Sequence, residues 1–195
     1  MNKKEMLNEY IKEYGCIWTK ALMDIILDSS NEILDLLLFN LPDDKNFFQT
    51  VETCTLKNII MPNGDYSKYN FKFIELFEVT FPETSKIPKS FFEDIDPSSC
   101  LITVPAQDYS DFSINKKSFK TIYYPKGSIL PKDRDLFKQN SFNVSISGKL
   151  PKINLNEYNL DGVEFSHIEF DEDTIFPNYV DFFQKQTYRV FIIGL

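Results

Sequence analysis

The residues best suited to bind a metal ion are three polar side chains near the end of the chain. His167, Glu169 and Asp171 alternate along a segment with the pattern of a β-strand, so all three would project from one face. Imidazole and carboxylate groups are common ligands of transition metals. A metal site would need support from another segment, and His167 is the only histidine. We therefore interpret these residues as a solvated strand face and expect no metal or other cofactor.

Other catalytic signatures are absent from the sequence. Cys16, Cys54 and Cys100 lie in apolar contexts and form no CxxC pair, so we expect reduced, mostly buried thiols. The six glycines form neither a phosphate-binding loop nor a GxSxG turn. We predict that the protein is not an enzyme, although a catalytic triad assembled from distant segments remains an alternative.

The net charge of −8 is concentrated at the two ends of the chain. Residues 1–48 carry five lysines against nine acidic residues, and residues 151–195 carry three basic residues against eight acidic ones. This distribution argues against nucleic-acid binding, which needs a basic surface. The longest apolar runs, Leu36–Phe39 and Val190–Ile193, are too short to span a bilayer. We expect a cytoplasmic protein that does not bind membranes.

One short fragment recurs along the chain: an aliphatic residue, any residue, then a bulky apolar residue, often followed by proline. Its alternation predicts a β-strand. Its copies begin at Leu37, Ile59, Val79, Ile102, Ile122, Val144, Ile168 and Val190, at intervals of 20 to 24 residues. These intervals are too short for a helix between every pair of strands, so they predict one strand per coil of a solenoid.

Two types of coil alternate, giving a unit of about 43 to 46 residues. One type has an apolar residue at every fifth position and resembles the coils of pentapeptide-repeat proteins: Met61, Tyr66, Phe71, Leu76 and Phe81, then Val104, Tyr109, Ile114, Phe119 and Tyr124. The other has a strand, a turn and a short helical segment around Phe91 and resembles a leucine-rich repeat. Thr84, Ser128 and Thr174 stand where that family usually has asparagine at the turn. The leucine-rich resemblance covers residues 34–195 and implies right-handed coiling.

We therefore predict a mainly β (α+β) fold, a right-handed parallel β-solenoid of about seven to eight coils that is similar to leucine-rich repeats. The solenoid would occupy residues 34–195, and a helical cap anchored by Trp18 would occupy residues 1–33 of the same integrated domain. Residues 30–39 could be a short helix or the first coil. The apolar segment 188–195 lacks a polar cap, so two chains could form a homodimer there, or the chain itself could cover it.

The outward face of the sheet is the best candidate for a binding site. In leucine-rich repeats this face is concave and binds protein, so the resemblance implies a non-catalytic module for protein–protein interaction. The outward residues that we select are Ile60, Thr80, Leu101, Thr103, Tyr123, Ser145, His167, Glu169, Arg189 and Phe191, with Asn58 and Glu78 expected outward beside them. Tyr123 and Phe191 are the expected anchors. The alternative is an acidic inhibitor, either a nucleic-acid mimic or a toxin-immunity or anti-defence protein, that blocks a basic surface.

Overall fold

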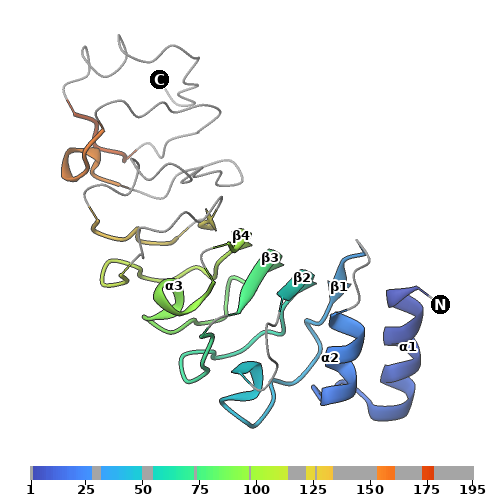
Figure 1. The fold of residues 1–195 in the computed structure, drawn as a ribbon. Coiled ribbons are helices and arrows are strands. Elements are labelled where there is room, and N and C mark those ends of the chain that lie inside the picture. Colours follow the sequence, from blue (N-terminus) through green and yellow to red (C-terminus); the bar gives the residue numbers. More distant parts are fainter. Residues whose placement is uncertain are drawn as a thin grey trace.

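The computed structural model contains two N-terminal helices followed by five parallel strands (Figure 1). It describes residues 2–27, 32–49, 55–72, 74–96, 98–113, 122–125, 127–133, 153–160 and 173–177. The elements, in chain order, are α1 (Lys3–Tyr14), α2 (Lys20–Ile26), β1 (Leu34–Asp35), the 3-10 helix η1 (Phe47–Gln49), β2 (Thr55–Ile60), β3 (Glu75–Thr80), α3 (Phe91–Asp94), β4 (Cys100–Thr103), β5 (Ile122–Tyr123) and the 3-10 helix η3 (Leu155–Glu157). A parallel sheet with few helices is a mixed α/β arrangement compatible with a mainly β fold.

The N-terminal helical segment is divided at Gly15. The helix α1 begins with a capping box, in which the Asn2 side chain accepts from the Glu5 N–H and the Glu5 carboxylate accepts from the Asn2 N–H. Gly15 then adopts a φ of +71°, which favours glycine, and its N–H donates to the Ile11 carbonyl oxygen. The chain turns there, and α2 packs beside α1 at the N-terminal end of the row of strands (Figure 1).

The five strands pair in sequence order, each parallel to the one before it. The fragments predicted at Ile59, Val79, Ile102 and Ile122 lie side by side in this register, which confirms those four copies and their spacing. All four side chains are buried, as alternation along a strand requires. Each connection therefore returns the chain to the same side of the molecule before the next strand begins, and one strand together with its connection is called a coil below.

The first predicted copy is wrong by three residues. Leu34, rather than Leu37, pairs with Ile59, so residues 34–36 form the first strand segment and residues 37–38 form a turn. Leu34 and Leu36 are fully buried, whereas Leu38 is exposed. Asp35 between the two buried leucines points outward, and its carboxylate accepts from the Leu37 N–H at 3.0 Å. Of residues 30–39, which were predicted as a short helix or the first coil, residues 32–39 contain no helix, and residues 30–31 lie outside the described residues.

Each of the three longest strands contains one residue with a positive φ. These are Asn58, Glu78 and Leu101, with φ values of +55°, +54° and +56°. They occupy equivalent places in β2, β3 and β4, because the residues on either side of them are paired in register. The positive φ interrupts the regular alternation of side chains between the two faces of the strand. Both Leu56 and Ile59 therefore point inward although they are three residues apart.

A second set of parallel bridges links the coils in pairs: Ile17 with Asn40, Asp65 with Lys86, Asp108 with Ile129, and Asn154 with Ile175. The first members of these pairs are separated by 48, 43 and 46 residues, which matches the predicted two-coil unit over residues 65–175. The segment between α1 and α2 takes the first place in this series. Trp18 then corresponds to Tyr66, Tyr109 and Leu155, and all four side chains are buried.

Aromatic rings join the coils in the core. A series of ring contacts, with centroids 5.1 to 6.0 Å apart, runs from Trp18 through Phe48, Phe71, Phe91, Phe92 and Tyr109 to Tyr124. Each favourable ring pair contributes about 1 kcal/mol beyond the burial of its area. The prediction that Trp18 is a core anchor is confirmed, since 4% of its surface is exposed.

The predicted equivalence of the turn residues Thr84, Ser128 and Thr174 is wrong at one position. Ser85, Ser128 and Thr174 each precede a bridge residue, so Ser85 rather than Thr84 is the equivalent of the other two. Ser85 accepts from the Gly64 N–H and pairs with the Asn63 side chain. The Ser128 hydroxyl is buried without a hydrogen-bond partner, because Ala106 stands where the earlier unit has Asn63.

Candidate functional site

Four of the predicted binding residues form one continuous row across the sheet. Ile60 on β2 pairs with Thr80 on β3, Thr80 with Thr103 on β4, and Thr103 with Tyr123 on β5. All four side chains are half-buried, whereas their neighbours in the strands point into the core. Paired parallel strands are about 4.8 Å apart, so the row from Ile60 to Tyr123 spans about 14 Å. Asp35 on β1 extends the row at its N-terminal end.

The positive-φ residues form a second row beside the first. Leu101 is half-buried and Glu78 is exposed, as expected for outward residues. Asn58 was also expected to point outward, but this is wrong, since 2% of its surface is exposed. Glu78 and Leu101 share its left-handed backbone, so the positive φ alone does not bury Asn58, whose side-chain oxygen is buried without a hydrogen-bond partner. Glu78 makes no hydrogen bond or ion pair with the residues that the structure describes, which leaves its carboxylate open to solvent.

The remaining charged groups on this face are engaged with neighbouring strands. Lys57 Nζ lies 5.3 Å from the centre of the Phe77 ring on the adjacent strand, within the range of a cation–π interaction. The Glu75 carboxylate accepts from the Thr55 hydroxyl at 2.7 Å and from the Ser98 hydroxyl at 3.0 Å. The sequence analysis missed these contacts of Lys57 and Glu75, although the 20-residue spacing that pairs Ile59 with Val79 also pairs Thr55 with Glu75.

Five of the predicted binding residues lie outside the described residues: Ser145, His167, Glu169, Arg189 and Phe191. The proposed metal-type triplet and the apolar C-terminal segment lie outside them as well. Within the ranges that the structure does describe, no group of three or more histidine, cysteine, aspartate or glutamate side chains could hold a metal ion. Of the cysteines, Cys16 is a free thiol and is half-buried.

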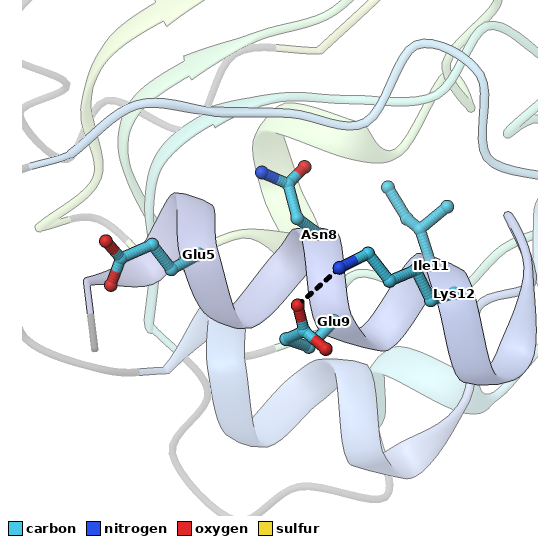
Figure 2. A pocket seen from close by; sticks show the side chains of 5 residues that line it. All are labelled: Glu5, Asn8, Glu9, Ile11 and Lys12. Atoms are coloured by element: carbon cyan, nitrogen blue, oxygen red, sulfur yellow. Dashed lines mark hydrogen bonds and ion pairs between the residues drawn. The ribbon is translucent and has the colours of Figure 1, made fainter.

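A separate depression lies on the outer surface of α1, lined by Glu5, Asn8, Glu9, Ile11 and Lys12 (Figure 2). Lys12 Nζ lies 2.6 Å from Glu9 Oε1 within this surface, and both side chains are mostly exposed. The lining residues follow one another on a single helix, so no other described element forms an opposing wall. Charges that are paired and solvated in this way are poor candidates for catalysis.

The aspartates at the turns have a structural role that accounts for part of the acidic charge. The Asp65 and Asp108 carboxylates accept from the N–H groups of Ser67 and Ser110, and Asp96 binds Ser98 in the same way. Hydrogen bonds from the serine hydroxyls, and then from the backbone, lower the pKa of all three carboxyl groups. Such Asx-turns explain why Asp or Asn so often precedes a buried residue of the five-residue pattern.

Comparison with known proteins gives no relative. No protein-family model, no curated protein and no solved structure matches this chain. Among the described residues, no helix is long and apolar enough to cross a membrane.

Proposed function

We propose that this chain is a non-catalytic protein-binding module, and that its partner lies against the outward face of the parallel sheet. In this proposal residues 34–195 form a right-handed solenoid of seven to eight coils of the leucine-rich type, and residues 1–33 cap it. The observation that carries the proposal is the row formed by Ile60, Thr80, Thr103 and Tyr123. It offers half-exposed aliphatic, hydroxyl and aromatic groups on a backbone fixed by parallel pairing.

The chemistry of this face suits a protein partner. Interfaces are enriched in aromatic and aliphatic residues near their centre and carry charged groups at their edge. Tyr123 and Leu101 supply the apolar side chains on β5 and β4, and Asp35 and Glu78 supply charge on β1 and β3. The strands lie along the inner side of the curve that the described elements follow (Figure 1), which lets several strands contact one partner.

The alternative of an acidic inhibitor has less support. A nucleic-acid mimic needs exposed acids in rows that no basic side chain neutralises. A backbone bridge places Lys86 beside Asp65, and Lys89 Nζ lies 3.3 Å from the Asp111 carboxylate. The described aspartates at the turns are therefore interleaved with lysines and serve the local backbone.

The test is affinity capture from native lysate with the wild-type chain and the Tyr123→Glu variant. Tyr123→Glu places a charge at the end of the row, so the partner should be lost while the circular dichroism spectrum and melting temperature stay close to wild type. Tyr14→Glu is the matched control, because Tyr14 is 45% exposed on α1 and lies outside the sheet. Equal capture by all three proteins would refute the role of the sheet face.

A further inference from the structure

Two side chains on the sheet face stand at backbone positions that do not suit them. Glu78 and Leu101 have φ values of +54° and +56°, in the left-handed region that glycine and asparagine tolerate best. Asn58 occupies the same place in β2 and is a residue type that this backbone tolerates, although its side chain is buried there with an oxygen that has no hydrogen-bond partner. The backbone adopts a positive φ at this place in each of the three strands, but this does not require a carboxylate or an isobutyl group. Neither side chain is fully buried, so core packing does not explain the choice.

The chemistry of these two positions differs along the face. Glu78 lies on β3 with a carboxylate that no described residue binds, and Asp35 adds a second acid two strands away on β1. Leu101 lies on β4, and Tyr123 follows on β5. The other charged groups facing this region, Lys57 and Glu75, are already engaged with neighbouring strands. The face therefore carries two acids, Asp35 and Glu78, over β1–β3, where Lys57 and Ile60 also lie, and apolar side chains over β4–β5.

We propose that Glu78 and Leu101 select the partner of this face, and that the segment they select is extended and carries a lysine or arginine about three positions from a leucine or an aromatic residue. This inference rests on the proposed function. The spacing follows from the sheet. The basic residue of the segment would face Glu78 on β3, and its apolar residue would lie over Leu101 and Tyr123 on β4 and β5. Strands β3 and β5 are two strands apart, which is about 10 Å, and an extended chain covers that distance in about three residues. The charge follows from the free carboxylate of Glu78, since opposite charges across an interface determine which partners are accepted.

The probe is a phage-displayed library of random 12-residue peptides, selected on the immobilised full-length chain. Peptides that depend on Tyr123 for binding are kept, synthesised and measured by fluorescence anisotropy. We expect a lysine or arginine two to four positions from a leucine or aromatic residue in the selected peptides. Their affinity should fall about tenfold for Glu78→Lys and recover when the basic residue of the peptide is changed to glutamate.

Two further variants separate recognition from folding. Glu83→Lys makes the same charge change at an exposed turn residue after β3, and it should bind the peptides as wild type does. Leu101→Asn should raise the melting temperature by about 2 °C, because asparagine suits the positive φ, and should nevertheless weaken the peptides about tenfold. A gain in stability together with a loss of binding cannot arise from misfolding.

The outcomes distinguish this inference from the proposed function. Peptides that require Tyr123 but show no basic residue, or bind Glu78→Lys and Leu101→Asn as tightly as wild type, would overturn the inference and leave the sheet face as a binding surface. Failure to select any peptide that requires Tyr123 would overturn both.

Discussion

Replacement of Glu78 by glycine should stabilise the protein. A non-glycine residue in the left-handed region costs about 1–2 kcal/mol, and glycine at the same place costs about 0.5–1 kcal/mol through its greater freedom in the unfolded chain. The Glu78 side chain is exposed and makes no hydrogen bond or ion pair with the described residues that would be lost. The expected net gain is about 0.5–1 kcal/mol, which for a chain of this size raises the melting temperature by about 1–4 °C.

The assay is thermal unfolding followed by circular dichroism, with urea unfolding at 25 °C to obtain the free energy. Thr80→Gly is the matched control, because Thr80 lies two residues further along the same strand and has no positive φ. Glycine there should cost about 1 kcal/mol through lost strand propensity and added chain entropy. If Glu78→Gly destabilises the chain as much as Thr80→Gly does, the positive φ is not strained and the reasoning about the second row fails.

Three further changes test the turns and the core. Tyr66→Phe removes the hydroxyl that donates to the Pro62 carbonyl oxygen at 2.5 Å, and it should cost about 1–2 kcal/mol in urea unfolding because a buried acceptor loses its donor; an unchanged midpoint would contradict this. Hydrogen bonds lower the pKa of Asp65 below its usual 3.8, so the stability that this group contributes is complete above that value and is lost as the pH falls below it. Asp65→Asn should keep the turn and weaken the acid dependence of the melting temperature between pH 5 and about 2, and an equally steep decline in the variant would refute the linkage. Ala106→Asn should give the buried Ser128 hydroxyl a partner and add about 1 kcal/mol, whereas a loss of stability would show that the two units are not equivalent there.

The spacing of the strands could be predicted because each coil places one aliphatic residue in the same inward position. The intervals between Ile59, Val79, Ile102 and Ile122 equal the offsets by which β2 to β5 pair with one another. The four adjacent outward residues follow from the same register, since a strand alternates between its two faces. All four residues of the row from Ile60 to Tyr123 could therefore be placed on one face from the sequence alone.

The first coil could not be placed in the same way, because leucine occupies almost every position there. Leu34, Leu36, Leu37 and Leu38 satisfy an inward pattern in more than one register, and a shift of three residues exchanges the buried and exposed members. Asp35 is the residue that distinguishes the correct register from the alternatives. It can lie only outward, and its carboxylate holds the turn that follows. A polar residue between apolar ones was the usable signal.

The left-handed positions show where sequence and backbone disagree. An apolar residue three places before another, as with Leu76 and Val79, cannot lie on the same face of a regular strand, so the backbone between them must depart from regular geometry. Just before β4, Ser99 replaces the leucine, and its hydroxyl accepts from the Leu76 N–H at 2.9 Å. The fold thus imposes a positive φ in every one of these coils, whatever residue stands there. Glu78 and Leu101 occupy this positive-φ position although the backbone there favours asparagine or glycine. A side chain that is kept at such a cost points to a function, and both of these side chains lie on the outward face of the sheet.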